Sequence, residues 1–398
     1  MAIHTKRRRW RLALAGFAVA SATALLGTSI ATANTGTVTP TNRAVPRLAL
    51  PAPTGDHPVG TTSLHLVDHS RPDPWNPNAK ARELMVSIWY PARADVGKRA
   101  RYMTPQESQA LVEFREVELP PGVPATIAST TRTHARVGAP PVVTRTGHPL
   151  VVLSPGFTMP RSSLTAVAEE LASHGFVVAA IDHTYETIVQ FPDGRLTTCL
   201  ACENLGQETF EKVIRGRAGD TAFVLDTLTG ARPGWRGARL IDPTRIGMAG
   251  HSIGGASTWH TMLTDERIAA GINMDGTFFL LEDTTMPRPF LLLGAESHET
   301  SEDPTWEAAW SAMTGWKRWL QVQQAHHGTF TDWPLLLDQL GVPNTGPDAI
   351  DSTRGIEVTR RYVSAFFTHH LTGTPQPLLD GPSPDYLDVM FWKDPATE

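Results

Sequence analysis

The stretch that most constrains this chain is residues 250–254, which read Gly-His-Ser-Ile-Gly. A short apolar run precedes it, and the helix-permissive segment 256–263 follows at once. This pattern is typical of a sharp strand-turn-helix bend that exposes its central serine, because only glycine fits two positions away on either side of such a turn. We therefore expect Ser252 to be a nucleophile. The helix would begin at the bend, so the backbone N–H of Ile253 is predicted to stabilise an oxyanion.

Segments with strand-like and helix-like patterns alternate regularly from Pro149 onward. Such alternation indicates a mostly parallel sheet with helices on both faces, which is the α/β fold class, and ligands of these sheets gather at the carboxyl ends of the strands. The predicted strands are 62–67, 84–90, 150–153, 176–181, the run before Ser252, 268–274, 290–293 and 319–322, and the predicted helices are 162–174, 210–228, 256–263, 305–316 and 356–369.

Residues 1–33 have the three parts of a secretory signal peptide: a basic cluster at 6–11, an apolar region at 12–26 and Ala-Thr-Ala at 31–33. The apolar region is too short to span a bilayer comfortably, and no later segment approaches about 18 uninterrupted apolar residues. We expect a secreted protein with no transmembrane span in the mature chain. The arginine cluster leaves both general secretory and twin-arginine export open.

Removing residues 1–33 takes away five positive charges and moves the formal net charge from −5 to −10. An acidic mature chain argues against a nucleic-acid partner. With 398 residues, of which 41% are hydrophobic, the chain can bury one large core. We predict a disordered or loosely laid N-terminal arm at 34–60 and a single domain at 61–398. This domain has a long excursion at 92–148, with one helix at 105–114, that either walls the site or is peripheral.

A serine of this kind needs a histidine that takes its proton and a carboxylate that orients the histidine. In folds with this bend they follow the serine in the order acid, then histidine. His326 and His327 lie in the loop after strand 319–322, so either is a candidate base. Asp275 ends one predicted strand and Glu296 ends the next, so either is a candidate acid.

Cys199 and Cys202 are the only cysteines in the sequence. In an exported protein they most simply form a local disulfide or remain two thiols. Two cysteines alone cannot complete a zinc site, and the sequence has no phosphate-binding loop or metal-ligand cluster that stands out. We therefore predict neither a metal nor a cofactor.

Five segments carry a family likeness: 153–157 (Leu-Ser-Pro-Gly-Phe), 171–182, 247–255, 273–275 and 327–332. Together they resemble the plasma-type platelet-activating factor acetylhydrolase family of α/β-hydrolases, from about residue 61 to residue 370. The resemblance implies an α/β-hydrolase fold, with Asp275 as the acid and His327 as the base. It also implies that the backbone N–H groups of Ile253 and Phe157 form the oxyanion hole. The family has Ser-His-Gly where this chain has Ser-Pro-Gly.

Segments 153–157 and 171–182 also resemble bacterial cutinases and polyester hydrolases. Those enzymes place the acid after the following strand, where this chain has His298, and the difference favours Asp275. The resemblance implies a secreted serine ester hydrolase that acts on short-acyl esters, including sn-2 short-chain phospholipids, with a small ester or lipid as its partner. A cutinase-like lipase or polyester hydrolase, an acyltransferase, and a non-catalytic binding module on the same fold are the alternatives.

Overall fold

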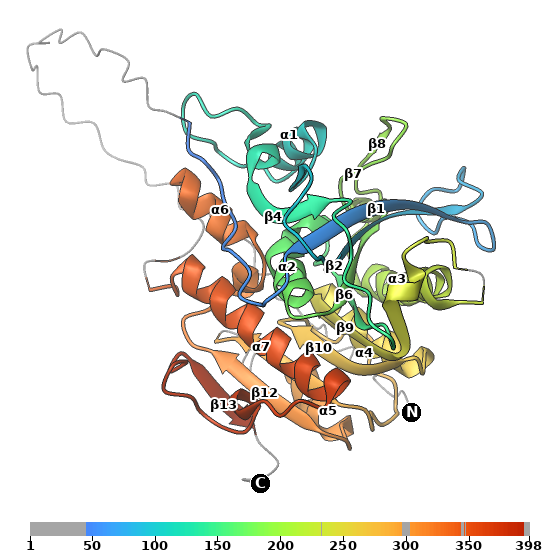
Figure 1. Ribbon diagram of the computed structural model, residues 1–398, viewed down its shortest axis with the longest axis vertical. Helices are drawn as coiled ribbons and strands as arrows, with labels where there is room; N and C mark the ends of the chain where they lie inside the picture. The colour runs from blue at the N-terminus through green and yellow to red at the C-terminus, as the bar shows by residue number, and fades with distance from the viewer. Residues whose placement is uncertain (1–44, 232, 297–302, 344–345, 347, 394–398) are drawn as a thin grey trace, which may run out of the picture. The chain divides into compact units, whose positions relative to one another are not determined.

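The computed structural model describes residues 45–231, 233–296, 303–343, 346 and 348–393. Its centre is an 11-stranded sheet in the order β13-β12-β11-β10-β9-β5-β6-β2-β1-β4-β3 (Figure 1). The strands of this sheet are β1 (Val59–Asp68), β2 (Arg82–Pro91), β3 (Arg99–Arg101), β4 (Arg132–Val137), β5 (His148–Ser154), β6 (Val177–His183), β9 (Ile241–His251), β10 (Ile268–Met274), β11 (Phe290–Ala295), β12 (Lys317–Val322) and β13 (Val389–Lys393).

The middle of the sheet is parallel, as the alternation of strands and helices predicts. Strands β6, β5, β9, β10, β11 and β12 all run in one direction, whereas β2 is antiparallel to both β6 and β1, and β13 is antiparallel to β12. The register pairs Ser154 with Gly250 and Asn273 with the same Gly250. The carboxyl ends of β5, β9 and β10 therefore meet at one edge.

Helices cover both faces of the sheet. Helices α2 (Thr165–Ser173) and α7 (Ser352–Thr372) cover one face, and α3 (Gln207–Thr229), α4 (Ile253–Thr264) and α5 (Pro304–Ala312) cover the other (Figure 1). Successive side chains of a strand point to opposite faces, and β5 shows the consequence. Its Val151 and Leu153 join the core under α2 and α7, whereas Leu150 and Val152 join the core under α3 and α4.

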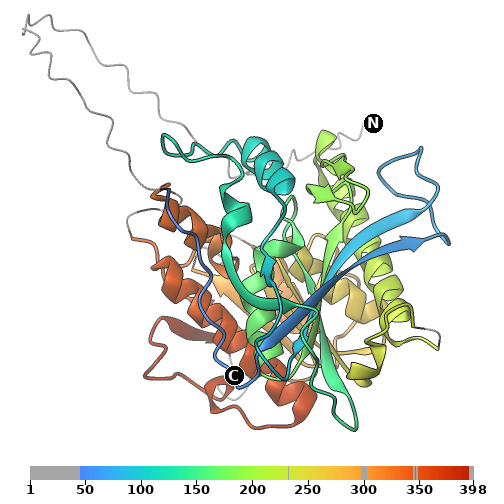
Figure 2. The ribbon, with the colours of Figure 1, turned by 45° about the horizontal axis from the view of Figure 1, so that its top comes forward.

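A smaller apolar cluster holds the 92–148 excursion against the domain. It joins Leu111 of α1 (Pro105–Phe114) with Leu335 of α6 (Trp333–Leu340) and with Leu48 and Leu50 of the N-terminal segment. Helix α1 begins at the predicted residue because Thr104 and Glu107 cap it reciprocally. In Figure 2, α1 and the hairpin of β7 (Val189–Gln190) and β8 (Leu196–Thr197) rise from the same end of the sheet.

The N-terminal segment differs from the expectation of a disordered arm over its described part. Leu48 and Leu50 are only 2% and 3% exposed, and the Leu50 N–H donates to the Arg132 carbonyl at 3.0 Å. Two leucines spaced by one residue place both side chains on the same side of an extended chain, and that side packs under α1 and α6. Residues 1–44, with the predicted signal peptide and the start of the arm, lie outside the described residues.

Apart from the small β7–β8 hairpin and the short 3-10 helices, four elements of the structure were not predicted: β3, β4, α6 and β13. Strand 319–322 is thus not the last one, because β13 pairs with it in antiparallel fashion. The three added strands are short and lie at or beside the sheet edges, where pairing with distant residues decides the structure.

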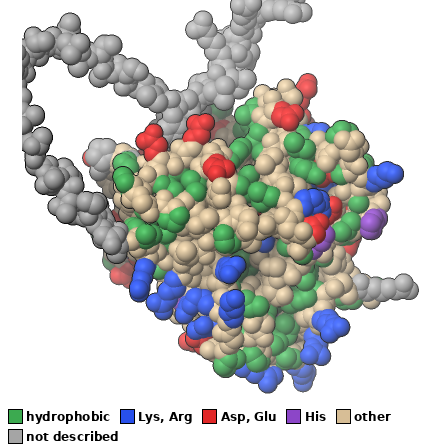
Figure 3. Space-filling model, turned by 90° about the horizontal axis from the view of Figure 1, so that it is seen from above, with side chains coloured by type: hydrophobic (Ala, Val, Ile, Leu, Met, Phe, Trp, Pro, Cys, Tyr) green, Lys and Arg blue, Asp and Glu red, His purple; other side chains and the backbone are tan. Residues whose placement is uncertain are grey.

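Among the described residues, no helix is both long and apolar enough to cross a membrane. Viewed from above, Lys and Arg side chains gather mostly along the lower edge of the molecule, while Asp and Glu lie mostly toward the upper part (Figure 3).

Candidate active site

Ser252 occupies the bend between β9 and α4. Its backbone has φ 55° and ψ −129°, a conformation that non-glycine residues rarely adopt. The surrounding glycines are required by contact distances. A Cβ atom on Gly250 would lie 2.1 Å from the Gly254 carbonyl, and one on Gly254 would lie 2.1 Å from the Ser154 carbonyl oxygen. The bend is held further by the Ser252 N–H, which donates to the Met274 carbonyl at 2.8 Å.

The structure brings Ser252, His327 and Asp275 into one hydrogen-bonded chain. The His327 Nε2 lies 2.9 Å from Ser252 Oγ, and its Nδ1 lies 2.6 Å from Asp275 Oδ2. Asp275 follows β10 directly and is buried, and its Oδ1 accepts the Ala295 N–H at 2.7 Å. The His327 side chain is 58% exposed. The acid is therefore fixed by the sheet, while the imidazole faces the solvent from which a substrate would enter.

The other candidates from the sequence have different partners. His326 caps the short helix η5 (His327–Phe330) by accepting the Gly328 N–H at 3.2 Å, and burial lowers its pKa. Glu296 Oε2 accepts the Gln324 N–H at 2.6 Å and so ties two loops together. His298 lies outside the described residues. Of the paired alternatives, the structure therefore places His327 and Asp275 with Ser252.

Two backbone N–H groups face the neighbourhood of Ser252 from different segments. Ile253 is the first residue of α4, and Phe157 lies in the loop after β5. That loop passes close to the serine, since a Cβ atom on Gly156 would lie 3.4 Å from Ser252 Cβ. Neither N–H donates a hydrogen bond to another residue within the described part of the chain. Both are thus free to donate to a ligand oxygen.

A buried arginine that the sequence did not indicate, Arg217, binds the start of the Phe157 loop. Arg217 of α3 donates from Nη1 to the Pro155 carbonyl and, at 3.1 Å, to Ser154 Oγ. Its Nε donates to Glu186 Oε2 at 2.8 Å. The Glu186 carbonyl in turn accepts the Thr158 N–H at 3.1 Å, so the loop is anchored on both sides of Phe157.

Ser154, which Arg217 contacts, also belongs to a fully buried network of charged and polar side chains. His183 Nε2 lies 3.0 Å from Ser154 Oγ, and His183 Nδ1 lies 2.8 Å from Asp220 Oδ2. Arg82 donates to both oxygens of Asp220, at 3.1 and 2.8 Å. Burial lowers the pKa of His183, so its ring is neutral, donates to Asp220 and accepts from Ser154. No local pattern marks these residues, because their contacts join segments far apart in the sequence.

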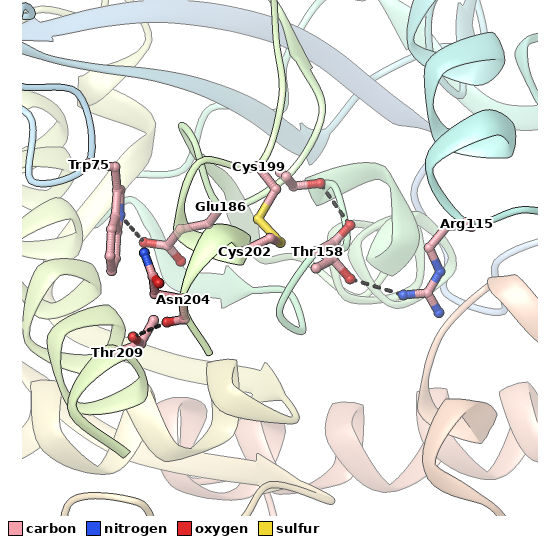
Figure 4. The surroundings of a disulfide bond; sticks show 9 residues. Trp75, Arg115, Thr158, Glu186, Cys199, Cys202, Asn204 and Thr209 are labelled. Atoms are coloured by element: carbon pink, nitrogen blue, oxygen red, sulfur yellow. Dashed lines mark hydrogen bonds between the residues drawn. A yellow bond between two sulfur atoms is a disulfide. The ribbon is translucent and has the colours of Figure 1, made fainter. Parts of the chain in front are cut away.

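The two cysteines form a disulfide beside the same loop. Cys199 and Cys202 are joined at 2.03 Å between sulfur atoms. Figure 4 shows Thr158 between this disulfide and Arg115, whose Nη1 donates to Thr158 Oγ1 at 2.9 Å. Arg115 follows helix α1 of the 92–148 excursion. The excursion therefore contacts the Phe157 loop through Arg115.

An aromatic cluster lies next to the two free N–H groups. Phe157, Phe210 and Phe279 pack against Ile253, with ring centroids 5.9 Å apart for Phe157 and Phe210 and 4.6 Å for Phe210 and Phe279. All three rings are half-buried. They form an apolar surface on which a flat or aliphatic group could rest beside Ser252.

No group of three or more His, Cys, Asp or Glu side chains suited to a metal ion occurs among the described residues.

Known proteins similar to this chain are ester hydrolases. The solved structure of a ferulic acid esterase from Streptomyces cinnamoneus superposes with a TM-score of 0.78 and 44% identity, covering 87% of this chain and 100% of that one. A probable 1-alkyl-2-acetylglycerophosphocholine esterase from Arthroderma benhamiae is 33% identical over 62% of this chain and 66% of its own length. A bis(hydroxyethyl) terephthalate hydrolase from Streptomyces coelicolor is 34% identical over 37% of this chain and 38% of its own length.

The chain thus spans just under two thirds of the length of the first of these curated relatives and 38% of the length of the second. The structural neighbour and the sheet order confirm the predicted α/β-hydrolase fold. The family model for platelet-activating factor acetylhydrolase, isoform II, matches residues 43–190 and 238–375, which include Ser252, Asp275, His327 and the Phe157 loop. On the strength of this match over most of its length, the chain belongs to the platelet-activating factor acetylhydrolase isoform II family.

Proposed function

We propose that this protein is a serine carboxylic ester hydrolase that forms an acyl-enzyme on Ser252. The observation that carries the proposal is the hydrogen-bonded chain from Ser252 Oγ through His327 to the buried Asp275. Such a chain activates a hydroxyl that is otherwise a poor nucleophile. The sequence of residues 1–33 supports export, and we extend the proposal to a secreted enzyme.

In this mechanism His327 takes the proton of Ser252 Oγ as the oxygen attacks the ester carbonyl. The N–H groups of Ile253 and Phe157 stabilise the oxyanion, and Asp275 stabilises the imidazolium that has formed. His327 then gives its proton to the departing alcohol. A water molecule, deprotonated by the same histidine, releases the carboxylic acid and restores Ser252.

The nucleophile is tested by labelling with a fluorophosphonate probe. The wild-type protein should hydrolyse nitrophenyl acetate and carry the label on Ser252, and Ser252→Ala should lose both properties while its melting temperature stays unchanged. Ser311→Ala, at an exposed serine of α5, is the matched control and should behave like the wild type. A folded wild-type protein without activity or label would support the non-catalytic binding module instead.

Short-acyl esters are the substrate class that the family match favours, including phospholipids with a short sn-2 chain. A nitrophenyl ester series should therefore give the highest kcat/KM at short chain length. A platelet-activating factor analogue and an aliphatic polyester film, tested beside it, separate the phospholipid from the cutinase-like alternative. Added alcohols separate hydrolysis from acyl transfer, because a transferase would form a new ester.

The aromatic cluster favours a second substrate class, esters of aromatic acids. Phe157, Phe210 and Phe279 offer ring surfaces beside Ile253. The similarity to the ferulic acid esterase covers the full length of that esterase. Methyl ferulate is the substrate that tests this class. Phe279→Ala should raise KM for methyl ferulate several-fold and leave nitrophenyl acetate almost unaffected, whereas Phe114→Ala, on α1, should change neither. Equal effects on both substrates would argue against an aromatic acyl site.

A further inference from the structure

A cavity of about 630 Å³ lies between strands β1 and β2 and the 92–148 excursion. Its walls come from β1, β2, β3, α1, the first turn of α2 and the segment 160–162. Ser252, Asp275 and His327 are not among the described residues that line it. The volume is within the range of roughly 300–1,000 Å³ that is typical of small-molecule sites. The cavity is therefore large enough for a ligand of its own, apart from the proposed catalytic serine.

The inner part of this cavity is apolar. Trp89, Tyr102, Met103, Leu111 and Ile188 line it, and each is at most 6% exposed. Side chains this buried are held in place by the core behind them, so the wall is preformed rather than collapsed. An apolar group of a ligand that packs against them would be removed from water, which favours binding, and the preformed wall would not have to rearrange.

The rim carries cations without partners. Lys98 and Arg101 line the cavity and are exposed, and neither forms a hydrogen bond or ion pair with another described side chain. Arg99 between them donates to the Thr133 carbonyl. An arginine fork without a protein acceptor can bind a carboxylate in bidentate fashion, and a nearby ammonium adds a further charge-assisted contact.

The acidic residues of the cavity bind backbone N–H groups, and none of them forms an ion pair with Lys98 or Arg101 among the described residues. Glu107 accepts the N–H groups of Thr104 and Gln190 at 2.9 and 3.1 Å. Glu169 accepts the N–H groups of His134 and Ala135 at 2.8 and 2.7 Å. Burial raises the pKa of Glu169 to about 7, which weakens its negative charge near neutral pH.

Arg161, at the base of the cavity, forms an ion pair with Asp182. Lys98 and Arg101 thus differ from the other charged side chains of the cavity, because among the described residues they alone have no hydrogen-bond or ion-pair partner. In a chain whose formal charge is −5, an unpaired positive rim over an apolar interior selects for an anion with an apolar body.

We propose that this cavity binds a small amphiphilic carboxylate, with its carboxylate between Lys98 and Arg101 and its apolar body against Trp89 and Tyr102. The class includes both free aliphatic acids and the aromatic acids that the proposed hydrolysis would release. The site does not depend on the proposed function, because no residue of it belongs to the catalytic chain.

Isothermal titration with octanoate, ferulate and the neutral analogue octanol tests the proposal. Octanoate should bind saturably, and octanol should bind at least about tenfold more weakly, since a charge-assisted contact contributes on the order of 1.5–3 kcal/mol. The double variant Lys98→Ala/Arg101→Ala should weaken octanoate to the same extent. The control Arg93→Ala/Arg145→Ala removes two exposed cations of the same excursion that lie outside the cavity, and should leave binding unchanged. Ferulate binding in place of octanoate would identify an aromatic acid as the ligand.

Ser63→Trp provides a second measurement, because Ser63 is exposed and lines the cavity, so its replacement fills the opening at the loss of the long 3.4 Å contact between Ser63 Oγ and Ser87 Oγ. This variant should abolish carboxylate binding and keep its melting temperature. The proposal is overturned if neither carboxylate binds, or if binding survives both Ser63→Trp and the double variant, which would place the ligand outside this cavity. Both measurements follow carboxylate binding and not esterase activity. A negative result for this cavity is therefore distinct from a negative result for the proposed hydrolysis.

Discussion

His251 Nε2 lies 2.7 Å from the carbonyl oxygen of His327, so the residue before Ser252 holds the loop that carries the imidazole. Burial and the neighbouring His327 lower the pKa of His251 to about 3, and the ring therefore stays neutral. With its single proton on Nε2, the ring donates to His327, and its Nδ1 faces the Phe157 loop, where a Cβ atom on Gly156 would lie 2.8 Å away. One side chain thus joins the turn, the histidine loop and the loop of the second free N–H.

We predict that His251→Phe lowers kcat about tenfold with little change in KM, because a buried carbonyl that loses its donor costs roughly 1–3 kcal/mol and frees the His327 loop. His251→Gln, whose amide nitrogen can reach the same carbonyl, should recover most of the rate. Steady-state kinetics on nitrophenyl acetate measure both. Equal losses in the two variants would show that ring packing, rather than the hydrogen bond, is what matters.

The identity of the acid is tested by neutralising each carboxylate in place. Asp275→Asn should lower kcat by about 10⁴, the scale observed when a triad carboxylate loses its charge, and leave KM nearly unchanged. Its Oδ1 can still accept the Ala295 N–H, so the strand end should stay intact. Glu296→Gln should cost far less, because among the described residues the Glu296 carboxylate accepts only the Gln324 N–H. The reverse ranking would move the acid to the end of β11.

Arg217 is predicted to act through the position of the Phe157 N–H. Arg217→Lys keeps the charge beside Glu186 but cannot reach Ser154 and Pro155 together, so the loop loses an anchor. We expect kcat to fall by about ten- to a hundredfold while KM changes little. The upper end of this range equals the effect of removing one oxyanion donor. Affinity for a boronic acid transition-state analogue should fall in parallel. Arg215→Lys, at an exposed position of the same helix, is the control. A rise in KM alone would contradict a positioning role.

We predict that the free energy of unfolding falls with rising pH because of the buried Glu169. Burial raises its pKa to about 7, above the ordinary value of 4.5, although the Ala135 and His134 N–H groups oppose the shift. The folded state therefore holds the proton more tightly, and its contribution, of order 3 kcal/mol, is complete below pH 4.5 and is lost as the pH rises through 7. Urea unfolding between pH 5 and about 8 measures the slope.

Glu169→Gln should flatten that slope, and Glu113→Gln, exposed on α1, should not. The adjacent Glu170 titrates in a separate window. Burial would raise its pKa, but hydrogen bonds from His174 and Thr54 and the charge of Arg360 lower it to about 2, so its contribution is lost only as the pH falls below 4.5. An unchanged slope in Glu169→Gln would assign the titration to another group.

The sequence alone was sufficient where the cause is local. The bend at Ser252 needs Gly250, whose missing side chain makes room for Gly254 four residues on, and the parallel core follows from apolar runs that alternate with helical ones. These patterns depend on backbone sterics and periodicity, which need no distant partner. The family resemblance, in turn, selected His327 and Asp275 from pairs that the residues themselves left open.

Tertiary structure decided whatever depends on distant residues. His327 meets Ser252 across 75 positions, and Arg217 reaches Pro155 across 62, so no local pattern could reveal the anchored loop. Leu48 and Leu50 have an ordered place only because α1 and α6 supply the surface that buries them. The same holds for Lys98 and Arg101. Only the folded structure shows that they lie at the rim of a cavity and have no partner among the described residues, because the sequence does not show which charges are paired or which side chains are buried.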